Sequence, residues 1–488
     1  MARLFWCLIV SLYLLLGILG GRPSLAFTGY EYGVTDTKEY KEVVFLNGQP
    51  LIFKGTVKES TSEKNNVVTT TLSYKLTGPN KGDTISRTVK LESTKTQNDN
   101  QEVYTTRLTG ISESLALSGQ RYKLNKDGVF FSSTKVVDRK PVVDYITETW
   151  HYKKVYEAGK AVYTVTIEAS GSSQGYANAW GKGTTTTSLA QITYSKPSDG
   201  QVIGEGQVKT VMSSSYNRNL RYVSSKVDLS SFSGGYVDEA YTEENLKASY
   251  DLPVLSSSGE RSKGEVSLAM VSPPQQRHLF IREFRDVRNH WARPSIEAMC
   301  GLGAFDNQGT MFGPGLAARR IDLAQGLAQV CGLVSQDTGK KINTKTKGKE
   351  VHEPVFFDVP PDSPKYKYVK EVYQRGILLG TAYGLFEPGR EVTRAEAITA
   401  LVRALGLGRL APVAKSDTGF LDDGEIPLWA KDSVMVAKEL GLVKGDGGYF
   451  RPSDVMTRAE LATLLDQLRL YLNREFNKDY REHLYNYG

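Results

Sequence analysis

The chain has 488 residues, of which 61 are Lys or Arg and 54 are Asp or Glu, so its formal net charge at pH 7 is +7. Single hydrophobic cores rarely grow beyond about 250 to 300 residues, and the length therefore predicts more than one domain. The basic excess is mild and forms no dense block, which argues against nucleic acid as a partner.

Residues 1–26 have the pattern of a secretory signal. Arg3 precedes an apolar run from Leu4 to Leu19, and Ser24 to Ala26 form a small-residue end. We expect cleavage after Ala26, because the apolar run is short for a membrane span of about 20 residues and ends in helix breakers. Cleavage removes two arginines and no acid, so the net charge falls from +7 to +5. No membrane span is then expected in the mature chain.

Residues 27–272 have the pattern of antiparallel β-sheet. Apolar and polar residues alternate from Val68 to Leu76, the run stops at Gly78 to Gly82, and a second run follows from Ile85 to Leu91. Period-two alternation with β-branched residues around a Gly/Pro/Asn break is typical of a hairpin. We predict an all-β region, as one large domain or two small ones, whose role the sequence does not reveal.

This β-rich region shows little catalytic chemistry. His151 is its only histidine, it has no cysteine, and it lacks HExxH, GxSxG and phosphate-loop patterns. We therefore expect a non-enzymatic protein with no metal or cofactor. A carboxylate pair for glycoside hydrolysis has no spacing signature, so a wall-anchored polysaccharide-processing enzyme stays open as the alternative. The glycines from Gly171 to Gly183 predict a loop.

The second half of the chain contains a repeated tetrapeptide. Thr-Arg-Ala-Glu occurs at Thr393 to Glu396 and at Thr457 to Glu460, and Arg319 to Asp322 is a degraded copy; each follows a Phe-x-Pro. A repeated unit of this kind usually buries its apolar face by stacking on its neighbours. We predict three units, at residues 283–333, 356–407 and 419–470.

Each unit is predicted to be helix, loop, helix. The second helices carry apolar residues at i, i+3, i+4 and i+7, namely Ile398, Leu401, Val402 and Leu405 in unit 2 and Leu461, Leu464, Leu465 and Leu468 in unit 3. The first helices are shorter and end at a glycine. We expect the three units to share one core.

The tetrapeptide has a structural part and an unexplained part. Threonine at the N-cap and glutamate at N3 form a capping box. The arginine faces the positive end of the helix dipole, which is unfavourable by up to about 1 kcal/mol. Its repetition indicates either a bound anion or an ion pair with an aspartate of the repeats, and the spacing does not choose between them. The arginines are Arg320, Arg394 and Arg458, and the aspartates are Asp286, Asp358 and Asp422.

Three smaller features complete the pattern. Cys300 and Cys331 remain after signal removal and occupy apolar helix positions, so a disulfide and two buried free thiols are both open. Residues 334–355 form a basic linker, and residues 471–488 form a polar C-terminal tail.

In order, the motifs Phe-x-Asp, His-Trp-Ala, Gly-Ile or Gly-Leu, Phe-x-Pro and Thr-Arg-Ala-Glu resemble the S-layer homology (SLH) domains of bacterial surface proteins. The resemblance covers roughly residues 283–470 and implies an all-α pseudo-trimer of helix-loop-helix repeats. It further implies non-covalent binding of a pyruvylated secondary cell-wall polysaccharide, and a location at the cell wall or S-layer. Self-assembly of the β-rich domain into a lattice stays open.

The resemblance also implies a set of binding residues. The arginine would clamp the pyruvate carboxylate, the tryptophan would stack on a sugar, and the glycine would let the backbone approach the ligand. These positions are Asp286, Trp291 and Arg320 in unit 1, Asp358, Gly380 and Arg394 in unit 2, and Asp422, Trp429, Gly445 and Arg458 in unit 3.

The units depart from the family pattern to different degrees. Unit 1 has Arg319 at the capping position and Asn307 at the loop glycine, and unit 2 has Pro364 at the tryptophan position, with Tyr366 or Tyr368 as nearby substitutes. Unit 3 keeps every element. We therefore expect the grooves between units to be unequal and best preserved where unit 3 contributes. Arg458 is expected to bind the anion most strongly.

Overall fold

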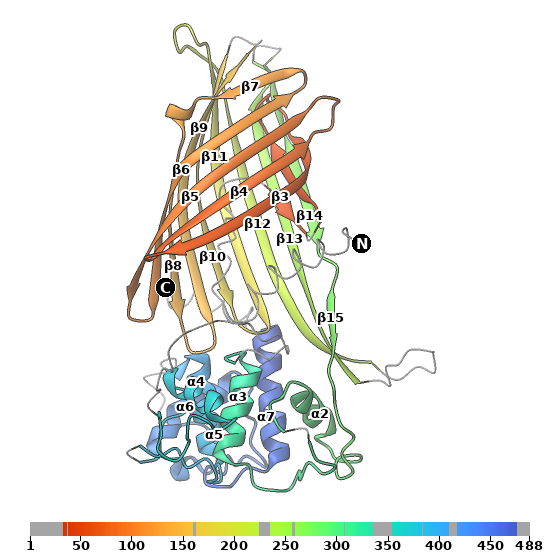
Figure 1. Cartoon of the computed structure of the whole chain (residues 1–488), viewed down its shortest axis with the longest axis vertical. Coiled ribbons are helices and arrows are strands. Elements are labelled where there is room, and N and C mark those ends of the chain that lie inside the picture. Colours follow the sequence, from red (N-terminus) through yellow and green to blue (C-terminus); the bar gives the residue numbers. More distant parts are fainter. Residues whose placement is uncertain are drawn as a thin grey trace.

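The computed structural model describes residues 33–36, 38–159, 163–223, 235–255, 259–306, 308–334, 354–382, 384–408 and 417–475. The predicted signal, nearly all of the basic linker, Asn307 and residues 476–488 lie outside this part of the chain. A tall curled sheet occupies one end of the molecule and a helical domain the other (Figure 1).

The N-terminal region forms one antiparallel sheet, which confirms the all-β prediction and selects one domain over two. Neighbouring strands follow the chain from β1 to β7 and from β9 to β14, while β8 pairs with β6 and β9, and β15 pairs with β13. The strands are β1 (Gly33–Thr35), β2 (Tyr40–Val44), β3 (Leu51–Lys64), β4 (Val67–Thr77), β5 (Thr84–Asn98), β6 (Gln101–Leu117), β7 (Gln120–Leu124), β8 (Phe130–Arg139), β9 (Asp144–Ala158), β10 (Thr164–Ala177), β11 (Gly181–Ser195), β12 (Val202–Val223), β13 (Gly235–Pro253), β14 (Arg261–Val271) and β15 (Gln275–His278).

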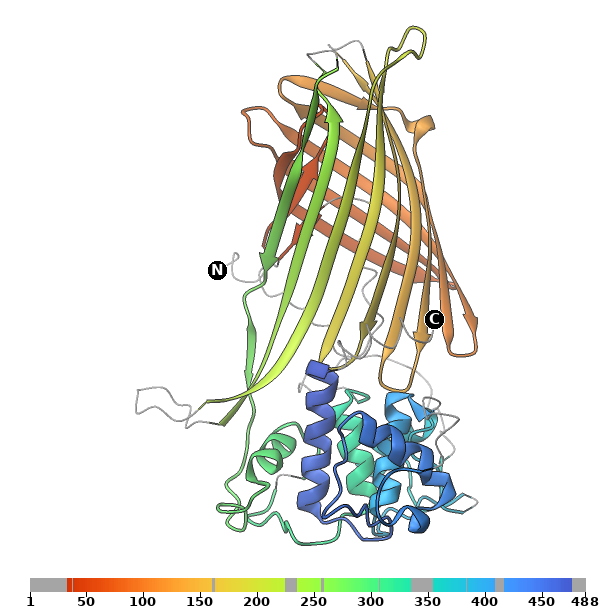
Figure 2. The same cartoon turned by 180° about the vertical axis from the view of Figure 1, so that it is seen from behind.

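The sheet curls until its first strand meets its last ones. The backbone N–H of Thr35 in β1 donates to Oε2 of Glu244 in β13 at 2.6 Å. Alternation places Leu72, Tyr74 and Leu76 of β4 on the buried inner face, as the sequence pattern predicts. β15 extends the sheet beyond the predicted boundary at residue 272 and leads down into the helical domain (Figure 2).

The loop predicted from Gly171 to Gly183 is wrong, because strands β10 and β11 fill most of it and only residues 178–180 turn the chain. The glycines serve close approach between strands instead. A Cβ on Gly171 would lie 2.4 Å from the Trp150 ring and 2.6 Å from the Thr187 carbonyl oxygen. Glycine inside a strand often marks such contact rather than a loop.

The helical domain confirms the predicted helix pairs. The helices are α2 (Arg293–Gly301), α3 (Arg320–Val330), α4 (Tyr366–Gln374), α5 (Arg394–Leu405), α6 (Leu428–Glu439) and α7 (Arg458–Leu470). A short 3-10 turn, η3 (Asp423–Glu425), precedes α6, and a π-helical turn, η4 (Tyr471–Glu475), follows α7. Another 3-10 turn, η1 (Lys126–Gly128), lies in the sheet region. No helix in the described ranges is long and apolar enough to cross a membrane.

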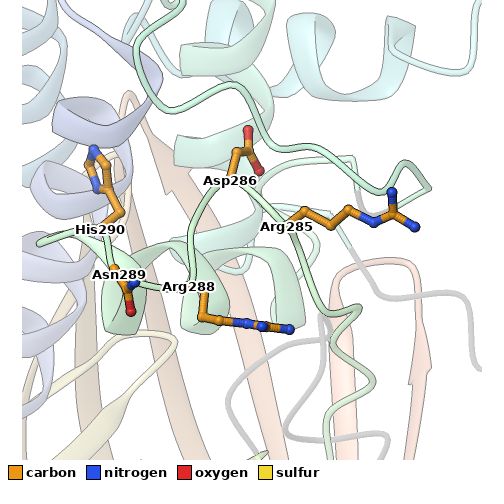
Figure 3. Close-up of a pocket in the computed structure, with 5 residues that line it drawn as sticks. All are labelled: Arg285, Asp286, Arg288, Asn289 and His290. Atoms are coloured by element: carbon orange, nitrogen blue, oxygen red, sulfur yellow. The ribbon is translucent and has the colours of Figure 1, made fainter.

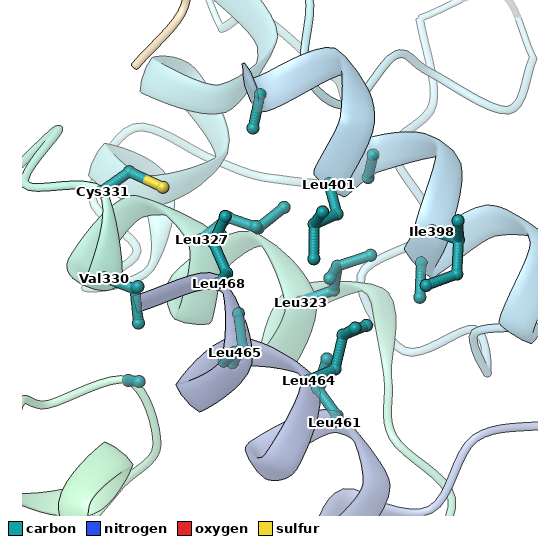
Figure 4. Close-up of a cluster of buried hydrophobic side chains, with 14 of the residues drawn as sticks. Leu323, Leu327, Val330, Cys331, Ile398, Leu401, Leu461, Leu464, Leu465 and Leu468 are labelled. Carbon is teal, nitrogen blue, oxygen red and sulfur yellow. The ribbon is translucent and has the colours of Figure 1, made fainter. Parts of the chain in front are cut away.

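The three second helices, α3, α5 and α7, pack around one core (Figure 4). Every apolar residue predicted for that core in units 2 and 3 is buried. Gly326 lets α3 approach α7 closely, since a Cβ there would lie 2.3 Å from Cδ1 of Leu465. The shared core is therefore confirmed.

Backbone hydrogen bonds join the three units in a closed ring. Ala318 donates to the carbonyl of Met456, Met456 donates to Val392, and Val392 donates back to Ala318, at 2.8, 2.9 and 3.0 Å. These residues each lie two positions before the repeated arginine of their unit. The three helix starts therefore meet around one point.

The helical domain is also packed against the sheet. The turn between β10 and β11 carries Trp180, which is buried in the same cluster as the helical core. Tyr471 and Leu472 are 4% and 1% exposed, so the start of the predicted polar tail belongs to this core. The asparagine beside the turn, Asn178, donates to the carbonyl of Leu472 at 3.1 Å. The two domains thus share a buried junction.

Candidate functional site

The three repeated aspartates hold the turns of their own units. Asp286 accepts the backbone N–H groups of Phe312 and Gly313 at 2.9 and 2.7 Å. Burial raises the pKa of Asp286, but these hydrogen bonds outweigh it and lower the pKa overall. Asp358 and Asp422 make the same paired contacts with the equivalent turns, at 2.6 to 2.9 Å. The aspartates are therefore fixed carboxylates at the base of each turn.

Each repeated arginine reaches into the next unit. Nε of Arg320 donates to the Phe386 carbonyl at 2.9 Å, Nε of Arg394 to the Phe450 carbonyl at 2.8 Å, and Nε of Arg458 to the Phe312 carbonyl at 3.1 Å. Each guanidinium also lies over the aromatic ring of the residue it contacts, at 4.7 to 5.5 Å from the centroid. Unit 1 thus contacts unit 2, unit 2 contacts unit 3, and unit 3 contacts unit 1.

The first amides of the second helices have partners in the next unit. The N–H groups of Arg394 and Ala395 donate to the carbonyls of Asp454 and Pro452 at 3.0 and 3.1 Å, and the other two helices repeat the arrangement. Free amides at a helix start favour anion binding, but these amides are satisfied by carbonyls. The case for an anion at these junctions therefore rests on the guanidinium groups rather than on the amides.

The three guanidinium groups differ in how far the protein uses them. Arg320 has a side chain 6% exposed, and its Nη2 donates to the Leu379 carbonyl at 2.8 Å. Burial lowers the pKa of Arg320 and the charge of Arg390 lowers it further. Arg458 lies 3.3 Å from the carboxylate of Asp322. Arg394 is half-buried, and no carboxylate in the described part of the chain lies within ion-pair distance of it.

The ion pairs considered from the sequence are present only at longer range. The charge of Arg394 contributes to the lowered pKa of Asp422, after burial and the backbone hydrogen bonds. The charge of Asp358 likewise acts on Arg320. Arg320 and Arg394 therefore interact at longer range with the aspartate of the next unit, while these groups make their hydrogen bonds to backbone atoms.

The aromatic and glycine positions divide into exposed and structural groups. Trp291 and Trp429 are 65% and 55% exposed, so their rings are accessible to a ligand. Gly445 has φ +72°, and a Cβ there would lie 2.8 Å from the Phe420 ring. Gly380 is equally close to the Phe356 ring and to the Leu385 carbonyl oxygen. Close packing within the turns is therefore enough to explain both glycines without a ligand.

Tyr368 does not give unit 2 an exposed aromatic ring in place of the missing tryptophan. This side chain is 8% exposed and its hydroxyl accepts a hydrogen bond from Nε2 of Gln329 at 3.0 Å. Tyr366 is partly buried against the common core. Tyr368 as a sugar platform is therefore a wrong prediction, because packing against α3 covers it.

A pocket of about 600 Å³ lies in unit 1 and is lined by residues that the repeat motif did not single out (Figure 3). Its lining is Arg285, Asp286, Arg288, Asn289 and His290. Only Asp286 belongs to the predicted set. Comparing the residues beside the motif across the three units would have shown that unit 1 alone is basic here.

The curled sheet contains a carboxylate pair, but it has the wrong surroundings for hydrolysis. Arg87 binds Glu42 through two nitrogens at 3.0 and 3.1 Å and binds Glu113 at 2.8 Å, and all three side chains are at most 2% exposed. Burial raises the pKa of Glu113, but Arg87 and Lys154 outweigh it and lower the pKa. A general acid needs a raised pKa and access to a substrate. This pair supplies neither.

His151, the other catalytic candidate of the region, lies 3.3 Å from Glu168 and packs edge-on against Phe130. Its side chain is 42% exposed. Among the described residues, no group of three or more His, Cys, Asp or Glu side chains could hold a metal ion. Cys300 and Cys331 are buried free thiols, which settles the alternative left open by the sequence.

A family model for the S-layer homology domain matches residues 356–398 and 419–462. These two segments are S-layer homology domains. They contain the fixed aspartates and repeated arginines of units 2 and 3, and Asp286 and Arg320 of unit 1 make the same kinds of contact outside the matched residues. An SLH domain indicates anchoring at the cell surface.

Relatives with SLH-type similarity have different overall roles. An S-layer protein of Bacillus thuringiensis subsp. finitimus is 32% identical over 110 residues, which are 22% of this chain and 13% of that protein. A cell surface protein of Thermoanaerobacter kivui is 35% identical over 106 residues, 22% of this chain and 14% of that protein. An endoglucanase of Bacillus sp. (strain KSM-635) is 31% identical over 132 residues, 27% of this chain and 13% of the enzyme. The chain spans about an eighth of the length of these relatives.

Proposed function

We propose that the helical domain is a three-unit pseudo-trimer that anchors this protein non-covalently to the bacterial cell wall. Its ligand is an anionic secondary cell-wall polysaccharide, and the anion is the carboxylate of a pyruvate group. The observation that carries this proposal is the arginine of each unit held against the turn of the next unit, with part of its charge facing a junction between units.

The junction between units 2 and 3 has the best chemistry for such a ligand. Arg394 is held in place through Nε, which leaves its two terminal nitrogens as donors for a carboxylate. Unit 3 adds the exposed ring of Trp429, which offers an apolar face for a pyranose. A guanidinium fork and an exposed aromatic ring, supplied by the two units of one junction, match the groups of an acidic sugar. This junction therefore ranks first in our proposal.

The other two junctions are weaker candidates. Arg458 faces unit 1, where Trp291 is exposed, but part of its charge is balanced by Asp322. Arg320 is buried and donates to two backbone carbonyls, so a structural role accounts for it. Binding should thus depend most on Arg394, then on Arg458, which the family pattern had placed first, and least on Arg320.

The test uses the whole mature chain, because the helical core includes Trp180 and other residues of the curled sheet. Purified sacculi that retain the pyruvylated polysaccharide should pellet the protein. Sacculi from which the pyruvate groups have been removed should not. Equal pelleting with both preparations would exclude the pyruvate carboxylate, and no pelleting with either would exclude wall anchoring.

We propose no enzymatic activity for the curled sheet. Its buried carboxylate pair is bound by Arg87, and the similarity to an endoglucanase covers only 13% of that enzyme. Release of reducing sugar from wall polysaccharide by the purified protein would contradict this. Self-assembly is a separate hypothesis, which electron microscopy of the mature protein would support by showing ordered arrays.

A further inference from the structure

The turn that opens each unit is the same in backbone but not in charge. The N–H of Arg285 donates to the Thr310 carbonyl at 3.0 Å, as Phe357 does to Gly384 and Leu421 does to Gly448. These three residues are therefore structurally equivalent. Phe357 and Leu421 are 73% and 70% exposed and apolar, whereas unit 1 presents an exposed guanidinium at this place.

The basic side chains of unit 1 line the pocket of about 600 Å³ (Figure 3). Arg285 and Arg288 extend in the same direction from the loop. Arg288 pairs with Glu283 at 2.7 Å, but the two side chains are 67% and 75% exposed, so solvent screens this pair. Both guanidinium groups are thus accessible to a ligand.

The two guanidinium groups make the pocket lining richer in hydrogen-bond donors than in acceptors. Both carboxylate oxygens of Asp286 are occupied by backbone N–H groups. Nδ1 of His290 accepts the Ala292 N–H at 3.2 Å, which leaves Nε2 as the donor of the neutral ring. A ligand that complements this lining must supply oxygen acceptors with negative charge.

The loop is fixed before any ligand arrives. Nη1 of Arg293 donates to the Arg288 carbonyl at 3.2 Å, and Nε of Arg293 pairs with Glu297 at 2.7 Å. Val287, in the middle of the loop, is 2% exposed. The exposed ring of Trp291 follows directly, at 5.4 Å from the His290 ring. A sugar platform therefore adjoins a rigid cationic pocket.

We propose that Arg285 and Arg288 form an additional anion subsite in unit 1, which binds a second negatively charged substituent, a carboxylate or a phosphate, on the wall polysaccharide. The inference rests on the proposed anchoring function and deepens it. The subsite gives unit 1 a specificity that units 2 and 3 lack, because Phe357 and Leu421, their equivalents of Arg285, are apolar.

The test compares the mature chain with the double variant Arg285→Ala/Arg288→Ala in pelleting with purified sacculi across a series of salt concentrations. We expect about tenfold weaker binding at low salt and a shallower salt dependence, the loss appropriate to two exposed charge-assisted contacts. The control is Lys247→Ala/Lys263→Ala on the sheet, which removes the same charge from side chains 58% and 65% exposed. This control should bind as the wild type does.

Two further arms identify the ligand group and guard against a folding defect. Arg285→Lys/Arg288→Lys should recover part of the affinity, which a variant damaged in folding would not do. Treatment of the sacculi with a phosphatase, which leaves the pyruvate carboxylates in place, should abolish the difference between wild type and double variant if the group is a phosphate, and should preserve it if the group is a carboxylate. Wild-type binding with an unchanged double variant would overturn the subsite alone. No wild-type binding would overturn the anchoring function, and the subsite with it.

Discussion

The indole N–H of Trp180 donates to the backbone carbonyl of Val330 at 2.7 Å, joining the β10–β11 turn of the curled sheet to the end of α3. The guanidinium groups of Arg218 and Arg469 lie over the same indole, at 4.4 and 5.5 Å from its ring. Arg218 is itself held by two hydrogen bonds to Asp238 at 2.8 and 2.9 Å. The anchor and the sheet are thus one structural unit rather than two independent domains.

Replacement of Trp180 by alanine should destabilise the protein strongly. The indole is 1% exposed, and truncation of such a side chain costs about 3 to 5 kcal/mol. Trp180→Phe keeps most of the packing and loses the hydrogen bond, for about 1 kcal/mol. Urea unfolding followed by circular dichroism measures both values. An alanine variant within about 0.5 kcal/mol of the wild type would show that the junction is not tightly packed.

Removal of Arg87 should leave two buried carboxylates without their partner. Breaking a buried ion pair from one side costs about 3 to 5 kcal/mol, so Arg87→Met should lower the free energy of unfolding by this amount. Arg107→Met is the matched control, since Arg107 pairs with Glu92 but is 71% exposed. The control should change stability by less than about 0.5 kcal/mol. Similar values for the two variants would contradict the buried network.

Stability should fall in acid partly through Glu102. Burial raises the pKa of Glu102, but hydrogen bonds from Arg139, Lys95 and Tyr104 outweigh it and hold the pKa at about 2. The folded pKa is below the unfolded value, so the contribution is present above about pH 4.5 and disappears as the pH falls towards 2. The difference in Tm between wild type and Glu102→Gln should be largest near neutral pH and should shrink over this window. A constant difference from pH 7 to pH 2 would argue against the assignment.

The two cysteines should be inert in the folded protein. Burial raises the pKa of Cys300 and Cys331 to about 12, so almost no thiolate exists at pH 8. A thiol reagent such as DTNB should label neither residue in the native protein and both in urea, and the mass should show no disulfide. Rapid labelling of the native protein would mean that the helical core opens.

The sequence predicted the local structure of the repeats well because that information is local. The i, i+3, i+4, i+7 spacing of Leu461 to Leu468 identifies a buried helix face. The capping boxes at Thr393 and Thr457 are present as predicted. In both cases the partners lie within one turn of helix, where spacing determines contact.

The contacts between units could not be predicted from residue spacing in the same way. Arg394 contacts the carbonyl and ring of Phe450, which belongs to the repeated Phe-x-Pro, but spacing does not show that the contact crosses to the next unit. Tyr471 and Leu472 are buried in the core shared by the helices and the sheet, although the sequence that follows them is polar. The strand glycines from Gly171 were misread because their neighbour, Trp150, comes from another strand.

The comparison of Arg394→Ala with Thr393→Ala in pelleting with pyruvylated sacculi tests the central claim most directly. Thr393 caps α5 through the Glu396 N–H at 3.3 Å, so its loss should cost about 1 kcal/mol of stability and leave wall affinity unchanged. Arg394→Ala should instead weaken binding at least tenfold while the protein stays folded by circular dichroism. Equal wall affinity of wild type and Arg394→Ala would contradict the proposal that this arginine binds the pyruvate carboxylate of the wall polysaccharide.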